Sequence, residues 1–389
     1  MSSKAIAIIM SLVCVALLSA ASAVSAAESV TREFPASSGG TLTLNLDTGG
    51  TVEITGDGGS SISVTYDLTC TPKCEIEFDE SSAGLEITTD FISRGNTQNS
   101  SIDITVHVPS YYDVEIDSMG GGLSINGVEG RFSGQTMGGD LELLDVRGEA
   151  KLETMGGSIR LIDAEMDGSL KTMGGSVLFE NVVGNIKGSS MGGNVRYKNV
   201  RRLDGQLGSP PRIDKGFDEV NMDSVQISTM GGTIDIEDAS EGADLHTMGG
   251  DIRISEADVF VRAMTMGGDI EIDSIDGWVK ATTMGGNIDV TVDGNGGDVN
   301  LTSMSGDIVL NVPSGFGMDL ELEIAYTRNS SQKFQINAPG KLAQTISPDW
   351  DHSQGSPRKF IRSSGAVNGG GNSVKVSTVN GTITIVDGR

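Results

Sequence analysis

Apolar and polar residues alternate in short runs along the chain, and in its middle the same run returns at a constant interval. In one such unit Ile159 and Leu161 are separated by a single polar residue, a pattern that predicts a half-buried β-strand. Later in the same unit, Leu170 and Thr172 repeat the alternation and predict a second strand. Each unit is therefore expected to contain two short strands joined by corners.

A Met-Gly-Gly motif marks each unit. Its methionine stands at positions 119, 137, 155, 173 and 191 and again at 230, 248, 266 and 284, so the spacing is 18 apart from one interval of 39. A variant copy, Met-Ser-Gly, follows at position 304. We interpret the long interval as one degenerate unit that begins at Ser209, followed by a coil with three extra residues.

Strands this short cannot bury themselves, and stacking equivalent strands of successive units in parallel solves the problem. The sequence thus predicts an all-β fold, a parallel β-solenoid of about ten 18-residue coils with irregular β caps at both ends. The glycine pairs are expected to supply corner backbone angles that other residues reach at a cost, with the methionines as flexible filler. The predicted corner residues are Met137, Gly138, Gly139, Met155, Gly156, Gly157, Met173, Gly174, Gly175, Met248, Gly249 and Gly250.

Four segments are predicted along the chain. Residues 1–27 are interpreted as a signal peptide, residues 28–118 as an N-terminal β cap, residues 119–311 as the solenoid repeats, and residues 312–389 as a C-terminal β cap with a polar loop. Within the last segment we expect a strand from Leu320 to Ala325 and a polar loop or excursion to about Gly371. The closing residues repeat the solenoid pattern and are predicted to form a terminal coil.

The first segment suggests an exported protein. Lys4 precedes an apolar run and then small residues, which is the pattern of a secretory signal peptide, and an uncleaved membrane anchor stays as the alternative. If the signal is cleaved, no membrane span remains, and the mature chain is periplasmic, on the outer surface or extracellular. It then keeps Cys70 and Cys74, an even pair that favours a disulfide in an exported protein.

The charge of the chain argues against several functions. With 27 Lys and Arg against 53 Asp and Glu, the formal net charge is −26, which repels nucleic acid. The chain has 3 His, at scattered positions, so neither catalytic residues nor a cofactor is predicted. Asp251, Asp269 and Asp307 recur at one position of the repeat, but calcium requires six to eight oxygen ligands, and no metal site is predicted.

One stretch reverses the charge. From Lys187 to Lys215 basic residues outnumber acidic ones, beside the irregular part of the repeat, where loops that carry function are commonly placed. Two interpretations stay open: contact with an anionic partner, or neutralisation of acidic neighbours on adjacent coils. The residues concerned are Arg196, Lys198, Arg201, Arg202, Arg212 and Lys215.

The repeat and its flanks resemble a known group of proteins. The run Val106-His107-Val108-Pro109, the tandem Thr-Met-Gly-Gly-x-Ile-x-Ile units and the closing Thr378-Val379-Asn380-Gly381-Thr382-Ile383 carry the likeness. Together they are similar to the bacterial putative-adhesin family with β-strand repeats, relatives of the auto-transporter adhesin head domain. The resemblance implies an exported β-solenoid without catalytic residues.

These observations predict an exported, non-catalytic β-solenoid that acts as an adhesin or as a structural protein of the cell envelope. Its expected partner is an unknown cell-surface or envelope component. The alternative function is an envelope sensor or regulatory ectodomain that binds an anionic ligand. A β-helix enzyme acting on polysaccharides is disfavoured, because aromatic residues for sugar stacking make up 4% of the chain.

Overall fold

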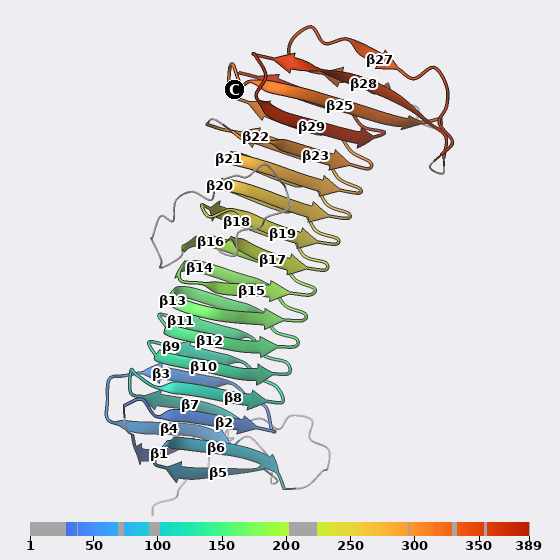
Figure 1. Cartoon of the computed structure of the whole chain (residues 1–389). Coiled ribbons are helices and arrows are strands. Elements are labelled where there is room, and N and C mark those ends of the chain that lie inside the picture. The colour runs from blue at the N-terminus through green and yellow to red at the C-terminus, as the bar shows by residue number, and fades with distance from the viewer. Residues whose placement is uncertain are drawn as a thin grey trace, which may run out of the picture.

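The computed structural model describes residues 29–36, 38–68, 74–92, 102–201, 224–294, 296–328, 333–353 and 356–388. Over these residues the chain forms strands and turns without a helix, which confirms the predicted all-β class. The strands stack into one elongated rod with two sheet faces (Figure 1). The predicted signal peptide lies outside the described residues.

One face of the rod contains the strands that precede the Met-Gly-Gly corners. From the N-terminal to the C-terminal end of the rod, this face consists of β5 (Cys74–Ser81), β6 (Gly84–Phe91), β2 (Thr41–Leu46), β8 (Asp113–Ser118), β10 (Glu129–Thr136), β12 (Arg147–Thr154), the end of β13 (Ile159–Thr172), β15 (Ile186–Ser190), β17 (Val225–Thr229), β19 (Ala243–Thr247), the ends of β20 (Ile252–Thr265) and β21 (Ile270–Thr283), β23 (Val299–Ser303), β29 (Asn372–Val379), β25 (Met318–Thr327), β28 (Arg358–Val367) and β27 (Gln344–Ile346).

The other face contains the strands that follow the corners. In the same direction it consists of β1 (Ser29–Pro35), β4 (Ser61–Leu68), β7 (Ile102–Val108), β3 (Val52–Gly56), β9 (Leu123–Asn126), β11 (Leu141–Leu144), the start of β13, β14 (Val177–Val183), β16 (Val195–Arg201), β18 (Ile234–Ala239), the starts of β20 and β21, β22 (Ile288–Val292), β24 (Ile308–Val312), β30 (Ile383–Asp387) and β26 (Ile336–Asn337).

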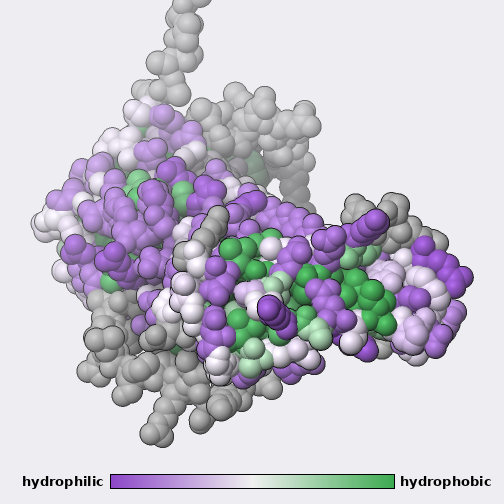
Figure 2. All heavy atoms as spheres, turned by 90° about the horizontal axis from the view of Figure 1, so that it is seen from above, coloured by the Kyte–Doolittle hydropathy of each residue, from purple (hydrophilic) through white to green (hydrophobic). Residues whose placement is uncertain are grey.

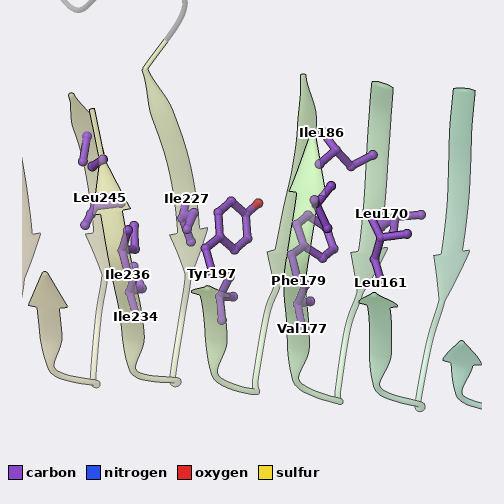
Figure 3. Packing of buried hydrophobic residues seen from close by; sticks show 14 of the residues in the cluster. Leu161, Leu170, Val177, Phe179, Ile186, Tyr197, Ile227, Ile234, Ile236 and Leu245 are labelled. Atoms are coloured by element: carbon purple, nitrogen blue, oxygen red, sulfur yellow. The ribbon is translucent and has the colours of Figure 1, made fainter. Parts of the chain in front are cut away.

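The pairing register reproduces the sequence repeat. Leu152 lies beside Leu170 on one face and Ile159 beside Val177 on the other, in parallel ladders that join each unit to the next. Equivalent side chains therefore stack on one another between the two faces. Phe179 and Tyr197 show this best, since their rings are buried and stacked with centroids 4.8 Å apart (Figure 3). The core is a continuous column of such stacks.

The long interval between Met191 and Met230 has a different cause from the one predicted. Val195 pairs directly with Ile234, and the amide of Met230 donates to the carbonyl oxygen of Met191 at 3.0 Å. The coil of Met230 therefore stacks directly on the coil of Met191. Ser209, where the degenerate coil was predicted to begin, lies outside the described residues. That coil was predicted from the 18-residue spacing alone. The spacing takes no account of Pro210 and Pro211, which have no amide hydrogen to donate to a ladder.

At each end, a coil from one terminus of the chain is inserted into the stack. Strand β2 pairs in parallel with both β6 and β8, and β3 with both β7 and β9. At the other end, β29 pairs in parallel with both β23 and β25, and β30 with β24 and β26. The closing segment thus forms the terminal coil that its sequence predicts, but inside the stack.

Antiparallel strands lie outside these inserted coils. Strand β5 pairs with β6, β1 and β4 extend the face beyond β7, and β28 pairs with β25 and β27. The stretch predicted as a polar loop before Gly371 therefore contains β27 and β28. The prediction missed β28 because its inward positions are mixed, with Ile361 and Ser363 both buried.

The C-terminal end of the rod carries hydrophobic residues on its surface. Viewed from above, they gather near the middle of this end, among hydrophilic neighbours (Figure 2). Ile346 of the outermost strand β27 is 61% exposed. That strand is three residues long, which limits the backbone it offers for pairing with another chain.

Candidate functional site: the Met-Gly-Gly edge

The Met-Gly-Gly motifs lie in one row along an edge of the rod. Each follows a strand of the first face, and the resulting turns line the right-hand edge of the view in Figure 1. The predicted corner residues are thus brought together by stacking, one motif above the next.

Close approach of successive coils explains the second glycine of each motif. A Cβ on Gly157 would lie 2.0 Å from the carbonyl oxygen of Gly139, and one on Gly250 would lie 2.1 Å from that of Gly232. Any side chain would collide with the backbone of the preceding coil. The predicted reason is wrong, because the glycines of the predicted corners do not have a positive φ.

Left-handed backbone occurs at the opposite corner of the coil. Asp145, Asp163 and Asn181 have φ angles of 47°, 53° and 55°, at equivalent positions in three successive coils. Asp and Asn are the side-chain-bearing residues that tolerate this conformation best. This second corner of the coil is therefore where the chain needs unusual backbone angles.

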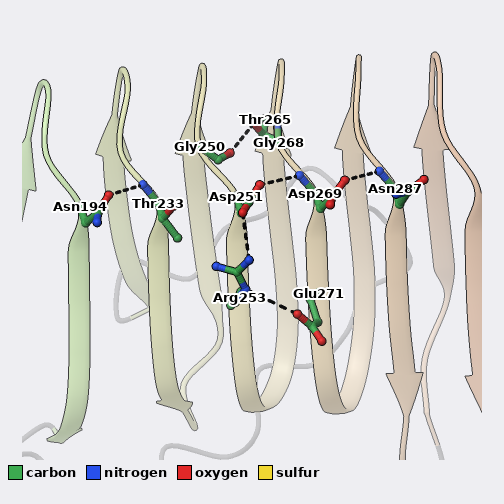
Figure 4. A network of polar contacts seen from close by, with 10 residues as sticks. All are labelled: Asn194, Thr233, Gly250, Asp251, Arg253, Thr265, Gly268, Asp269, Glu271 and Asn287. Atoms are coloured by element: carbon green, nitrogen blue, oxygen red, sulfur yellow. Dashed lines mark hydrogen bonds and ion pairs between the residues drawn. The ribbon is translucent and has the colours of Figure 1, made fainter.

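A buried hydroxyl closes each Met-Gly-Gly turn. The Thr265 hydroxyl donates to the carbonyl oxygen of Gly250 in the preceding coil at 2.8 Å and accepts from the amide of Gly268 at 3.2 Å (Figure 4). Thr154, Thr172, Thr247 and Thr283 make the same two bonds, and like Thr265 they are buried. The threonine ladder is therefore structural and faces inward.

A second ladder uses the carboxylates that were weighed for calcium. Asp251 accepts the amide of Asp269 at 3.0 Å, and Asp269 accepts the amide of Asn287 at 2.7 Å (Figure 4). Arg253 lies 2.9 Å from Asp251 and 3.5 Å from Glu271. Each carboxylate thus helps to hold the next coil in place. In the described part of the chain, no group of three or more His, Cys, Asp or Glu side chains could hold a metal ion.

The methionines of the edge face solvent. Their exposed fractions run from 42% at Met173 to 58% at Met119, so the prediction that they fill space at the corners is wrong. The outward orientation of the methionines could have been predicted from the sequence. Side chains alternate along a strand, so the residue next to an inward-facing Thr172 must face outward. An acidic protein therefore displays a row of thioethers on its surface.

Part of the predicted basic segment is neutralised by neighbouring coils. Arg196 Nε lies 2.9 Å from Asp235, and Lys198 Nζ lies 2.6 Å from Glu180. Arg201 ends β16, while Arg202, Arg212 and Lys215 lie outside the described residues. The structure brings Arg196 and Lys198 together with acidic partners, and contact with an anionic partner stays a prediction.

Cys74 begins β5, and Cys70 lies outside the described residues. The predicted disulfide between them therefore stays a prediction. In the described ranges, no helix has the length and hydrophobicity needed to cross a membrane.

The repeat region matches a known protein family. The model of the Toastrack DUF4097 family matches residues 41–386, which include the coils, their corners and both inserted ends. The chain belongs to the Toastrack DUF4097 family. This match confirms the family resemblance inferred from the sequence. No curated protein matches the chain.

Three solved structures are similar to this member of the family at low sequence identity. One is described as a "putative cell adhesion protein" from Clostridium sporogenes, with 10% identity, coverage of 92% of this chain and 100% of that chain, and a TM-score of 0.19. A "putative lipid binding protein" from Parabacteroides distasonis has 16% identity, coverage of 66% and 94%, and a TM-score of 0.29. A "putative adhesin" from Bacteroides fragilis has 12% identity, coverage of 93% and 98%, and a TM-score of 0.18.

Proposed function

We propose that this protein is an exported, non-catalytic adhesin or structural protein of the cell envelope that binds through the outside of its rod. The observation that carries the proposal is the repetition of surface side chains at fixed intervals, above all the exposed methionines. Apolar side chains occupy the space between the two faces, so ligands have access to the outer surface of the stack.

A repeated surface favours multivalent binding. Each coil presents equivalent positions about 4.8 Å from those of the next coil, because that is the spacing of paired strands. Weak contacts repeated along a polymer or another surface add up, since the second contact is intramolecular once the first has formed. An envelope polymer with its own repeat fits such a rod better than a small molecule does.

Binding and location test the proposal together. We expect antibody detection in cell fractions to find the protein outside the cytoplasm, and the purified chain from Glu28 onward to bind at least one purified envelope polysaccharide or peptidoglycan. Deleting residues 137–154 removes one complete coil and joins Thr136 to Met155, so the fold is kept. The shortened rod should bind the same polymer more weakly.

A deletion of residues 137–145 provides the control for folding. It removes half a coil and therefore exchanges the two faces of every later coil, so we expect loss of the β-rich circular dichroism spectrum. Cytoplasmic location, or absence of binding to all the polymers by a folded chain, would contradict the proposal.

A further inference from the structure

A local cluster of sulfur and nitrogen donors lies on the Met-Gly-Gly edge. The residue two positions before each corner methionine faces outward on the same side as that methionine, because side chains alternate along a strand. On two adjacent coils this residue is His246, which precedes Met248, and Met264, which precedes Met266. The residues at this position on the other described coils are Asp117, Gln135, Glu153, Lys171, Ser189, Ser228, Thr282 and Thr302.

The register places four such donors in one patch. His246 of β19 lies directly beside Met264 of β20 in the parallel ladder, and Met248 and Met266 follow two residues later on the same two coils. Neighbouring strands are about 4.8 Å apart, and residues i and i+2 are about 6.6 Å apart along a strand. Long, flexible methionine side chains can converge over that distance.

All four side chains are accessible. The methionines are exposed by 51% at Met248, 43% at Met264 and 47% at Met266, and the imidazole of His246 is 43% exposed. Their thioethers have no polar group to satisfy and gain little by facing water. Burial therefore does not explain why methionine occupies these positions.

The imidazole is oriented by a neighbouring carboxylate. His246 Nε2 lies 2.9 Å from Asp244 Oδ1, and a carboxylate accepts hydrogen bonds, so Nε2 carries the proton and donates it. In the neutral ring Nδ1 then keeps its lone pair. A carboxylate that holds the second nitrogen is the usual arrangement around a metal-binding histidine. The other carboxylate oxygen of Asp244, Oδ2, lies 3.9 Å from Arg262 Nη1. The side chain of Asp244 is largely shielded from water.

We propose that Met248, Met264, Met266 and His246 Nδ1 bind one Cu(I) ion. Thioether sulfur is a soft donor that selects Cu(I) over zinc, magnesium or calcium, and imidazole is a good copper ligand. The negative charge of the chain favours the approach of a cation. This site is independent of the proposed function, because its ligands come from two coils and it requires no envelope polymer.

An anaerobic Cu(I) titration of the purified full chain against the chelator bicinchoninate at pH 7.5 tests the proposal. We expect one Cu(I) ion to be held by the protein in competition with the chelator. With Ag(I) as a non-oxidising substitute, we expect shifts in the methyl resonances of Met248, Met264 and Met266 and in the Nδ1 resonance of His246. Failure of the folded chain to retain Cu(I) would overturn the proposal.

Matched variants separate a local site from a general property of the edge. Met264→Thr with His246→Ser installs the residues found at the same position on flanking coils, so the fold should persist, and we expect affinity for Cu(I) to fall at least about tenfold. The control replaces Met137, Met155 and Met173 with leucine, which removes three thioethers from the same edge. An equal loss in this control would show that no local site exists.

The role of Asp244 can be measured separately as that of a positioning residue. Asp244→Asn keeps the shape of the side chain but can turn its amide toward His246, and we expect Cu(I) affinity to fall about 10–100-fold. The Ag(I)-dependent shift of the His246 Nδ1 resonance should weaken with it. An unchanged affinity together with an unchanged nitrogen shift would contradict the assigned orientation.

Discussion

Individual corner residues decide how closely two coils can stack. Gly250 and Thr265 act as a pair, because the missing side chain of one lets the coils touch and the hydroxyl of the other bonds to the glycine carbonyl. Met248 has a different role, since its side chain faces water and takes no part in this contact. A short motif thus combines two residues needed for stacking with one that is available for binding.

The two glycines of a motif should differ sharply in their tolerance of a methyl group. In Gly250→Ala the new Cβ would lie 2.1 Å from the Gly232 carbonyl oxygen, whereas in Gly249→Ala the nearest atom, the carbonyl oxygen of Met230, is 3.6 Å away. We expect Gly250→Ala to lower the free energy of unfolding by about 3 kcal/mol or more, and Gly249→Ala to change it much less. Urea denaturation measures both. Equal effects would contradict the close-approach explanation.

At the level of the strand, charge alternates between coils in some rows and repeats in others. Arg196 lies opposite Asp235 on the paired strands β16 and β18, which is a favourable cross-strand pair. Asp258 lies directly opposite Asp276 on β20 and β21. Partial burial, followed by the charges of Asp276 and Asp238, raises the pKa of Asp258 above its ordinary value of 3.8.

This raised pKa predicts a pH-dependent stabilisation by Asp258→Asn. Because the folded state holds the proton more tightly than the unfolded state, the aspartate destabilises the fold at pH 7, and this cost disappears as the pH falls below the ordinary value of 3.8. The group is largely exposed, so we expect a gain of a few tenths of a kcal/mol at pH 7.

Urea unfolding at pH 7 and at pH 3.5 measures the difference. The control is Asp235→Asn, which removes the partner of Arg196 and should destabilise the rod at pH 7. A gain for Asp258→Asn that is the same at both pH values would show that charge repulsion is not its cause.

For the whole molecule, the stack is nearly one-dimensional, because each coil contacts its two neighbours. Stability is then close to a sum of coil and interface contributions. The inserted coils at the two ends are an exception to this simple order, since they connect segments far apart in the chain. Val299, at the end of the regular repeats, pairs with Val374 of the closing segment. The C-terminal end of the rod therefore depends on β29 and β30.

Removing β29 and β30 should loosen this end and leave the middle of the rod intact. A chain that stops at Gly371 loses β29, which lies between β23 and β25, and β30, which lies between β24 and β26. We therefore expect faster hydrogen exchange in β25 and β28. Strands β10 to β14 should keep their protection, because they do not contact the deleted coil. Mass spectrometry of exchanged peptides measures both regions, with a chain that ends at Asp387 as the control. Unchanged protection of β25 would contradict the insertion.

The sequence alone determined the coil and most of its interior. Alternation around Ile159 and Leu161, repeated at a constant spacing, leaves stacked parallel strands as the economical way to bury these side chains. The same alternation put Thr172 on the side of Leu170, and the structure shows that this side faces inward. The sequence also indicated two corners for each coil. The unusual backbone angles were predicted at the Met-Gly-Gly glycines, but the structure has them at the opposite corner, for example at Asp163.

Tertiary structure decided which coils are neighbours and which side chains meet across them. Local alternation is the same for any order of stacking, so it could not show that β29 lies between β23 and β25, or that the coil of Met191 meets that of Met230. The candidate copper site has the same origin. His246 and Met264 are one full repeat apart in the sequence and become neighbours only when their strands pair, because contacts between coils depend on register and not on local pattern.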